Sequence, residues 1–420
     1  METADGDLAS ILRGSASDLF IVLAPTNDAF ARFLSTNGFA SLAEVPADVL
    51  SQILLNHVIS ADLKAADLVG LGSGYTKTNA LGAGGNTMSL YFDTNDGVKF
   101  NNMSSVSTAD INASNGTIHI VDAVIDLPSI VDHAENNPNF SSLAEALVLE
   151  NLTTTLQTDG PFTVLAPTND AFATFLDPDS NSNPTGNVLS NILLNHVISG
   201  TRTSEDLLEQ DDTFTTTLAT GPNDTSINLY ANTSEVVRFK GVSSITLADI
   251  IGTNGIIHAV DAVINIPTVV TFALAIPNFL SLSRALEEAD SSDTDPMLIS
   301  TLSGPGPFTL FAPLNSSFTN LINSNPAWNS IEDVDDNLLN TVLLHHVVSG
   351  NIRIADIEDG DTPATLEGDI ITINRPGTNV NIADVTDGAE NSDIGIIGTN
   401  VQTGNGVIQV LNKGMLPTVE

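Results

Sequence analysis

The clearest structural signal in the chain is the stretch Phe162-Thr-Val-Leu-Ala-Pro-Thr-Asn-Asp-Ala-Phe172. Phe162 to Leu165 is a short β-prone run, and Pro167 closes it because proline cannot donate to a central strand ladder. Thr168 suits an N-cap, and Asp170 falls in the first helical turn, where the helix dipole favours negative charge. The stretch therefore predicts a strand, a turn and a helix.

This stretch occurs three times, and two other blocks repeat with it. It returns as Phe20-Ile-Val-Leu-Ala-Pro-Thr-Asn-Asp-Ala-Phe30 and, more loosely, as Phe308-Thr-Leu-Phe-Ala-Pro-Leu-Asn-Ser-Ser-Phe318. The second block covers 54–60, 193–199 and 343–349, and the third covers 115–128, 254–267 and 405–417. Pro25 and Pro167 lie 142 residues apart, a period that fits a whole domain and is too long for a solenoid unit. We predict three tandem domains at 1–128, 129–267 and 268–420.

The other blocks indicate a mixture of helices and strands. Leu189, Ile192, Leu193 and Val197 predict an amphipathic helix that runs toward His196. The third block opens with the turn signal Asn-Gly and continues as a largely buried strand that a proline ends. Between these blocks, residues 214–218 and 227–230 predict antiparallel strands. Each domain is therefore expected to be α+β.

The first copy is expected to be incomplete at its front. Copies two and three open with the helix-like segments Asn137–Leu147 and Ile276–Leu286, which have no counterpart before Pro25. The first residues carry neither a basic region nor an apolar core, so we find no signal peptide. We expect the chain to start inside its first domain, with the export signal missing; a natural gene start is the alternative. No run of about 18 apolar residues predicts a membrane span.

Charge excludes one large class of partner. Lys and Arg number 12 against 51 Asp and Glu, which gives a net charge of −39. Such an acidic protein repels phosphate backbones, so nucleic acid is not expected as a partner. Cysteine is absent, which removes disulfides, thiolate catalysis and Cys-ligated zinc.

The three repeated blocks resemble the signatures of the fasciclin domain. The Phe162–Phe172 block resembles the family's first signature, and Asn254-Gly-Ile-Ile-His-Ala-Val-Asp-Ala-Val-Ile264 resembles its second. Leu193-Leu-Asn-His-Val-Ile-Ser199 lies where the family usually carries a Tyr-His pair. The resemblance covers almost the whole chain, and it implies three tandem domains, each a β-sandwich or wedge flanked by helices. It also implies a secreted or cell-surface location and a role in cell adhesion or extracellular-matrix contact.

The resemblance also suggests candidate ligand or adhesion residues. In animal members, the Tyr-His pair and an Asp-Ile pair before the second signature are associated with integrin contact. The family's Tyr is replaced here by Asn or His, and the third copy has Asn400-Val401 in place of Asp-Ile, so a specific integrin contact is in doubt while adhesion in general is retained. The candidates are Asn56, His57, Asp110, Ile111, Asn195, His196, Asp249, Ile250, His345 and His346.

The ionisable residues have structural interpretations as well. His57, His196 and His346 follow an apolar helix, which is typical of core histidines satisfied by a backbone carbonyl. His258 and Asp261 lie three apart on a predicted strand, so their side chains point to opposite faces. We find no nucleophile-base pattern and predict that the chain is not an enzyme.

Two acidic loops raise the question of a metal ion. Asp93 and Asn95, and Asp177, Asp179 and Asn181, place oxygen ligands at alternate positions as calcium loops do. Neither loop completes the EF-hand pattern, so a solvated polar turn is the competing interpretation. No cofactor is otherwise expected.

These observations favour a secreted or cell-surface binding module that acts in adhesion through several weak contacts. Linked copies raise the effective concentration of the second binding event, so avidity is the expected mechanism. A cell-surface or matrix protein or polysaccharide is the expected partner. The alternative is a carbohydrate- or small-ligand-binding module of the cell envelope.

Overall fold

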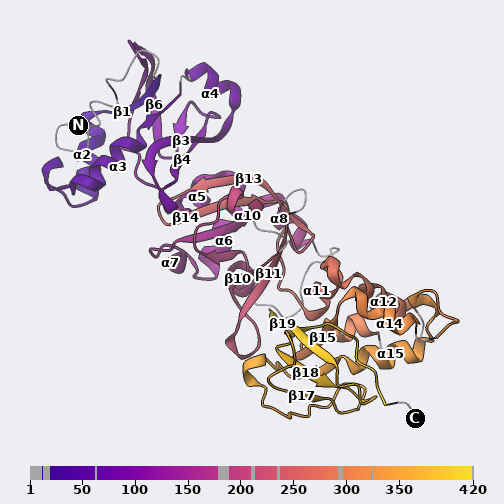
Figure 1. Cartoon of the computed structure of the whole chain (residues 1–420). Helices are drawn as coiled ribbons and strands as arrows, with labels where there is room; N and C mark the ends of the chain where they lie inside the picture. Colours follow the sequence, from indigo (N-terminus) through magenta and orange to yellow (C-terminus); the bar gives the residue numbers. More distant parts are fainter. Residues whose placement is uncertain are drawn as a thin grey trace. The chain divides into compact units, whose positions relative to one another are not determined.

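The computed structural model describes residues 12, 19–61, 64–177, 189–209, 213–233, 237–291, 297–323 and 325–418. Figure 1 shows the helices and strands of the chain. The chain divides into two units. The first unit consists of 1–183, 196–209 and 244–263, and the second of 184–195, 210–243 and 264–420. The division passes through the second copy, so each unit is described by itself. The predicted domain limits at 128 and 267 stay a prediction.

The three copies repeat one order of helices and strands. The first copy has β1 Phe20–Pro25, α2 Asn27–Thr36, η1 Leu42–Glu44, α3 Ala47–Asn56, β2 Val58–Ile59, α4 Ala65–Leu71, β3 Ser73–Leu81, η2 Ala83–Gly85, β4 Thr87–Asp93, β5 Lys99–Phe100, β6 Ser104–Ala113 and β7 Gly116–Val121. The second copy has α5 Ile130–Asn136, η3 Pro138–Phe140, α6 Ser141–Leu149, α7 Thr153–Leu156, β8 Phe162–Pro167, α8 Asn169–Leu176, α9 Leu189–Leu194, β9 Val197–Ser199, α10 Ser204–Glu209, β10 Thr213–Thr220, η4 Pro222–Asp224, β11 Ser226–Asn232, β12 Arg238–Phe239, β13 Ser243–Ile251 and β14 Gly255–Val260. The third copy has α11 Val269–Ala275, η5 Pro277–Phe279, α12 Leu280–Ser291, α13 Leu298–Leu302, β15 Phe308–Pro313, α14 Asn315–Asn323, η6 Ile331–Asp333, α15 Asp336–His345, β16 Val347–Ser349, η7 Ile354–Asp356, β17 Thr372–Asn374, β18 Ala383–Thr386, β19 Ile394–Thr403 and β20 Gly406–Leu411.

The predicted strand-turn-helix is confirmed. Strand β8 ends at Pro167, and the Thr168 side chain accepts a hydrogen bond from the Ala171 amide at the start of α8. Thr26 caps α2 in the same way in the first copy. Strand β8 pairs in parallel with β14, which confirms the predicted buried strand. The two most strongly repeated blocks therefore lie side by side in the sheet. Strand β14 ends at Val260, before Pro267, so the prediction that the proline ends it was wrong.

The predicted helix of the second block is shorter than expected. Helix α9 ends at Leu194, and Val197 is already in strand β9. The prediction was wrong on this residue because helical spacing cannot detect where a helix stops and a strand begins. In copy one the cap residue is His57, whose backbone amide donates to Leu54 and Leu55, and the chain then turns into β2.

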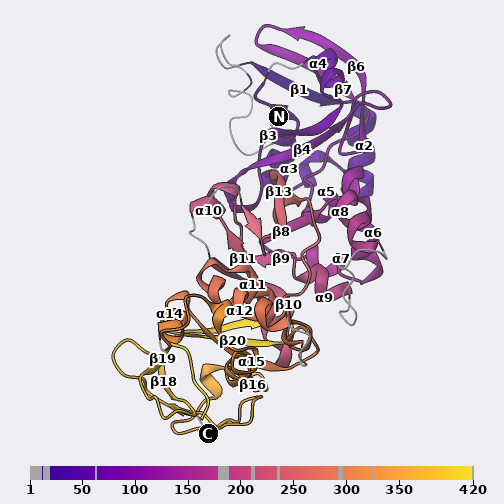
Figure 2. The same ribbon diagram turned by 90° about the vertical axis from the view of Figure 1, so that its right-hand side faces the viewer.

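The first unit contains two sheets. The strands of the first copy pair in the order β2-β1-β7-β6-β5-β4-β3. Strands β1, β3, β4, β6 and β7 of this sheet are labelled in Figure 2. In the same unit, β13, β14, β8 and β9 pair in that order. Helix α5 begins immediately after Ser129, whose side chain accepts a hydrogen bond from the Asp132 amide. The sequence had not predicted this short helix ahead of each signature.

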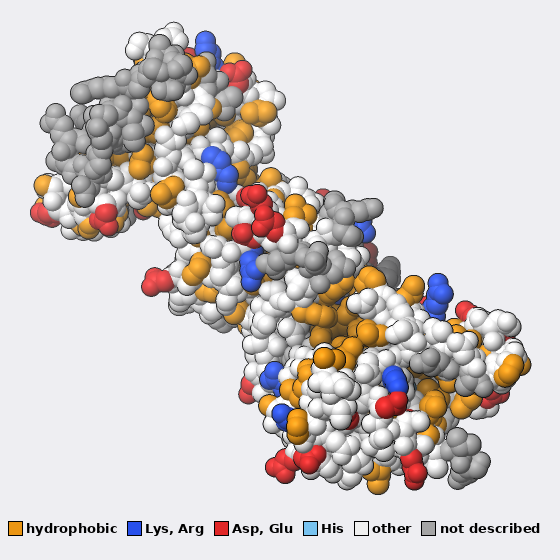
Figure 3. All heavy atoms as spheres, in the orientation of Figure 1, with side chains coloured by type: hydrophobic (Ala, Val, Ile, Leu, Met, Phe, Trp, Pro, Cys, Tyr) orange, Lys and Arg blue, Asp and Glu red, His pale blue; other side chains and the backbone are white. Residues whose placement is uncertain are grey.

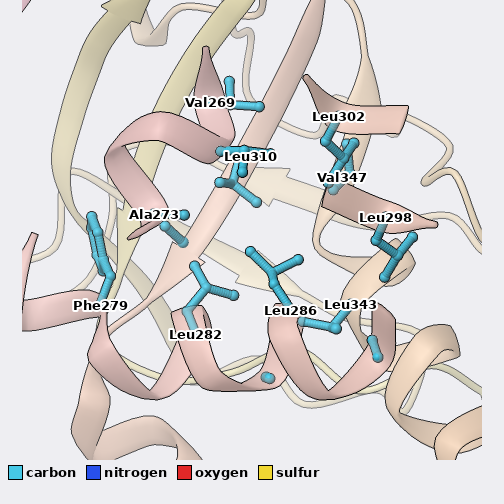
Figure 4. Close-up of a cluster of buried hydrophobic side chains, with 14 of the residues drawn as sticks. Val269, Ala273, Phe279, Leu282, Leu286, Leu298, Leu302, Leu310, Leu343 and Val347 are labelled. Atoms are coloured by element: carbon cyan, nitrogen blue, oxygen red, sulfur yellow. The ribbon is translucent and has the colours of Figure 1, made fainter. Parts of the chain in front are cut away.

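The second unit contains the strands β10, β11 and β12 and the complete sheet of the third copy, β16-β15-β20-β19-β18-β17. Phe214 pairs with Tyr230 in the antiparallel β10-β11 hairpin, which confirms the two strands predicted there. In the third copy, α12 packs its apolar face on the sheet. Figure 4 shows Leu282 and Leu286 pointing toward Leu310 of β15, and all three are buried. The architecture is α+β, as predicted.

No single helix in the described part of the chain is long and apolar enough to cross a membrane. One pair of helical segments, Val269–Ala275 and Pro277–Ser291, meets the length and composition of a span only when taken together, and it is bent by 94°. Its apolar residues, such as Val269 and Phe272, are buried in the core of the third copy.

Candidate functional site

Two of the candidate histidines, His57 and His346, hold a helix end to the last segment of their own copy. His57 Nδ1 lies 2.7 Å from the Ile53 carbonyl oxygen, and the Ile125 amide donates to His57 Nε2 at 2.9 Å. His346 repeats both contacts, with the Val342 carbonyl at 2.7 Å and the Met415 amide at 2.9 Å. The predicted core role is confirmed for these two residues, and His196 is equally buried.

The contacts of these rings fix their protonation. Since Nε2 accepts a hydrogen bond, Nδ1 carries the proton and donates to the carbonyl, which is the neutral tautomer. Burial lowers the pKa of His57 to about 4, and it lowers the pKa of His346 to about 4 as well. A neutral ring with both nitrogens engaged cannot act as a base toward an outside molecule.

The asparagine before this histidine is also used internally. Asn56 is fully buried, donates to the Asp126 carbonyl at 3.0 Å and accepts from the Thr78 hydroxyl at 3.0 Å. Asn195 repeats this arrangement with the Asn265 carbonyl and the Thr217 hydroxyl, both at 3.2 Å.

The third copy departs from this pattern. Its buried His345 replaces the asparagine, and His345 Nδ1 lies 2.9 Å from Glu367 Oε2. The Thr365 hydroxyl also donates to Glu367 Oε2, so a carboxylate joins the group in place of the asparagine oxygen.

The aspartate of the Asp-Ile pair holds a strained bulge in place. Asp110 and Asp249 have φ of 60° and 59°, a conformation that Asn and Asp tolerate better than other side chains. The Asp110 carboxylate accepts from the Ala65 amide at 3.0 Å, and that of Asp249 accepts from the Ser204 amide at 2.9 Å. Asn400 of the third copy has φ 59° and accepts from the Ile354 amide at 2.9 Å. Asn serves as well as Asp because the bond needs only an oxygen acceptor.

A buried residue of the second signature completes this bulge. His258 Nδ1 accepts from the Asp249 amide at 3.3 Å, and its Nε2 lies 2.8 Å from the Arg202 carbonyl. Gln409 makes the same pair of contacts in the third copy, accepting from the Asn400 amide and donating to the Ile352 carbonyl. Asp261 is exposed while His258 is buried, so the two side chains diverge as predicted.

The isoleucines of the Asp-Ile pairs differ sharply in exposure. Ile111 is 39% exposed, whereas Ile250 is 1% exposed. Within the first unit, Asp249 lies against the first copy, because the Lys77 ammonium donates to the Asp249 carbonyl at 2.5 Å. The amide of Ile251 donates to the Ser89 hydroxyl at 2.9 Å. The equivalent segment of the second copy is thus partly used in contact between copies, whereas Ile111 is accessible.

The contact between copies recurs in the second unit with different side chains. There the Gln402 amide donates to Asn228 Oδ1 at 2.7 Å, as Ile251 does to Ser89 in the first unit. In the first unit the Tyr75 ring meets the His133 ring at 5.5 Å, and in the second unit Phe214 meets Phe272 at 5.4 Å. Aligning the repeated strands of the copies places these residues at equivalent positions. Only the structure shows that their side chains face the next copy.

The candidate calcium ligands form a turn in the first copy. The Asn95 backbone and side-chain nitrogens donate to the Asp93 carboxylate at 3.0 and 2.8 Å. Asn95 thus presents donors to the carboxylate, and the pair is a polar turn in this structure. Asp177 follows α8, while Asp179 and Asn181 lie outside the described residues.

An apolar cavity of about 300 Å³ in the third copy lies beside His346. It is lined by Phe318, Leu321, Ile394 and Met415, and the Lys413–Asp393 ion pair lies at the same site. On the face shown in Figure 3, acidic side chains form small separate groups among uncharged ones.

A family model of the Fasciclin domain matches residues 3–128, 138–267 and 279–417. The Transforming growth factor-beta-induced protein ig-h3 of Sus scrofa is 26% identical over 364 residues, which cover 83% of this chain and 47% of that protein. This chain therefore spans about half the length of that relative. Uncharacterized protein sll1735 of Synechocystis is 35% identical over 140 residues, which cover 33% of this chain and 98% of that protein.

One solved structure is also similar. It is the FAS1 domain pair of the insect cell adhesion molecule Fasciclin I, with a TM-score of 0.39 and 20% sequence identity. The match covers 61% of this chain and 92% of that chain.

Proposed function

Because the chain belongs to the Fasciclin domain family, we propose that it is an extracellular or cell-surface adhesion protein. It contacts a cell-surface or matrix protein, or a polysaccharide, through several weak sites presented by linked copies. The observation that carries the proposal is that the repeated polar residues are used within each copy. His57, Asn56 and Asp110 all hold their own backbone, so what the chain offers to a partner is surface.

The first copy supplies the most accessible candidate contact. Ile111 is 39% exposed beside Asp110, whose carboxylate is itself 40% exposed. An exposed apolar side chain next to an acidic group is a suitable anchor for a weak protein contact. Ile250 is buried, so the first copy and not the second presents this pair to a partner.

The test is a surface variant of the full chain. Ile111→Ser removes the exposed side chain, and Met103→Ser is the matched control because Met103 is 55% exposed in the same copy. Binding to a panel of immobilised matrix proteins and polysaccharides is measured for both variants. We expect about tenfold weaker binding for Ile111→Ser and little change for Met103→Ser. Equal binding of Ile111→Ser and the unmodified chain would remove this pair from the proposal.

A small-ligand-binding module is the alternative, and the cavity of the third copy favours it. A volume of about 300 Å³ lies at the lower end of the range for ligand pockets, and the lining is predominantly apolar. Such a module binds one small apolar molecule in the third copy. Its affinity is then the same for chain in solution and for chain held on a surface, whereas adhesion through linked copies depends on surface density.

A further inference from the structure

We propose that His345, Glu367 and Asp369 form a binding site for a divalent transition metal ion of the zinc class in the third copy. One potential ligand atom from each of the three residues lies within 4.8 Å of the others. Among the described residues this is the one group of three or more His, Asp or Glu side chains close enough to share an ion. We call these three residues the His345 cluster.

The spacing in the cluster suits a shared ion. His345 Nδ1 lies 2.9 Å from Glu367 Oε2. Two ligand atoms bound at about 2.1 Å to one ion lie about 3.0 Å apart at a right angle and about 3.4 Å apart at a tetrahedral angle. The observed separation therefore fits neighbouring ligands of one ion as well as a hydrogen bond.

The third ligand is held close by the packing around Gly388. A Cβ atom at Gly388 would lie 2.4 Å from Asp369 Oδ2 and 3.1 Å from the His345 ring. The Asp369 carboxylate and the imidazole thus approach the same small space, which only glycine leaves open. Any side chain at position 388 would have to displace one of the two.

Neighbouring polar groups orient both carboxylates. The Thr365 hydroxyl donates to Glu367 Oε2 at 3.2 Å, and the Thr418 amide donates to Asp369 Oδ2 at 2.6 Å. Such outer hydrogen bonds are what fixes ligands at metal sites.

His345 Nδ1 faces the Glu367 carboxylate at 2.9 Å and therefore carries the proton, while the Gly388 amide donates to Nε2 over a long 3.4 Å. An ion bound at Nδ1 would displace that proton, as metal binding to histidine requires. One neutral imidazole with two carboxylates is a ligand set that Zn²⁺ and related ions accept.

Comparison within the chain shows that the fold does not require this cluster. The first and second copies fill the same position with Asn56 and Thr78 and with Asn195 and Thr217, which are neutral pairs. The third copy keeps a buried threonine here, but its Thr365 hydroxyl donates to Glu367, and His345 faces the same carboxylate. A shared cation would balance the charge that the two carboxylates bring to this position.

The experiment titrates Co²⁺ and Zn²⁺ into the metal-free full chain. Co²⁺ reports its ligands through visible absorption, and Zn²⁺ binding is followed by calorimetry and by the Tm. His345→Asn is the matched control, because it restores the residue of the first two copies and leaves all 51 acidic residues in place. We expect one tight equivalent per chain and a Tm rise of several degrees in the unmodified chain. In His345→Asn we expect at least tenfold weaker binding.

Two results would overturn the metal site. One is the absence of any saturable Co²⁺ or Zn²⁺ binding by the unmodified chain, which needs no variant to interpret. The other is equal binding by the unmodified chain and His345→Asn, which would assign the ions to surface carboxylates. Should His345→Asn fail to fold, as judged by circular dichroism, Asp369→Asn takes its place with the same expected loss of affinity.

Discussion

His133 shows how a single buried group makes this protein sensitive to acid. Its Nε2 lies 3.1 Å from the Ile251 carbonyl, and its Nδ1 has no hydrogen-bond partner among the residues that the structure describes. Burial lowers the pKa of His133 to about 4, with Asp132 opposing and Lys77 reinforcing the shift. The unfolded chain binds this proton near pH 6.5. Between these two values the unfolded state holds more protons, so acid favours unfolding.

The contribution of His133 to stability is therefore complete above pH 6.5 and is lost as the pH falls to 4. The loss amounts to roughly 3 kcal/mol in the free energy of unfolding. His133→Phe, which copies the third copy's Phe272, should remove this part of the pH dependence. Urea unfolding of both proteins at pH 7 and pH 4.5 measures the difference. An unchanged loss of stability in the variant would show that His133 is protonated in the folded protein.

At the scale of an element, Gln409 links strand β20 to the bulge in β19. It accepts from the Asn400 amide at 3.1 Å and donates to the Ile352 carbonyl at 2.9 Å. Gln409→Leu leaves two partly buried partners without a bond and should lower the free energy of unfolding by about 1–3 kcal/mol. Gln409→His restores the residue of the other copies and should cost much less. Denaturant unfolding measures the free energy of unfolding of both variants. A similar loss of stability in Gln409→Leu and Gln409→His would contradict the bridging role of Gln409.

The strand-turn-helix and the buried last strand could be predicted from sequence because their signals are local. Thr168 caps the helix three residues ahead of its bonding partner, and β14 is apolar apart from His258. The contacts that decide the roles of the site residues are not local. His57 bonds to Ile125, which is 68 residues away, and no periodicity indicates such a pair.

The same limit applies to the differences among copies. Glu367 lies 22 residues after His345 in a hairpin that differs from those of the other copies, so only the fold shows that the two side chains meet. The exposure of Ile111 and the burial of Ile250 also follow from the surroundings of each copy, although both residues follow an aspartate. Sequence repetition predicted equivalent positions, and the structure shows that equivalent positions are not equally accessible.

At the scale of the whole molecule, we propose that binding strength comes from the linked copies. Each copy offers an acidic surface with scattered apolar side chains, and we expect each contact to be weak by itself. Chain held densely on a surface should then engage partners far more strongly than chain in solution, because each first contact raises the effective concentration for the next.

The most direct measurement is the adhesion of matrix-coated beads to the full chain immobilised at a series of densities, with soluble chain as competitor. We predict that adhesion rises more steeply than the density of immobilised chain. Soluble chain should compete only at concentrations at least about a hundredfold above those at which a pre-clustered form competes, which is the order of the gain expected from linked sites. Adhesion that is absent at every density, or soluble chain that competes as well as the clustered form, would contradict the account.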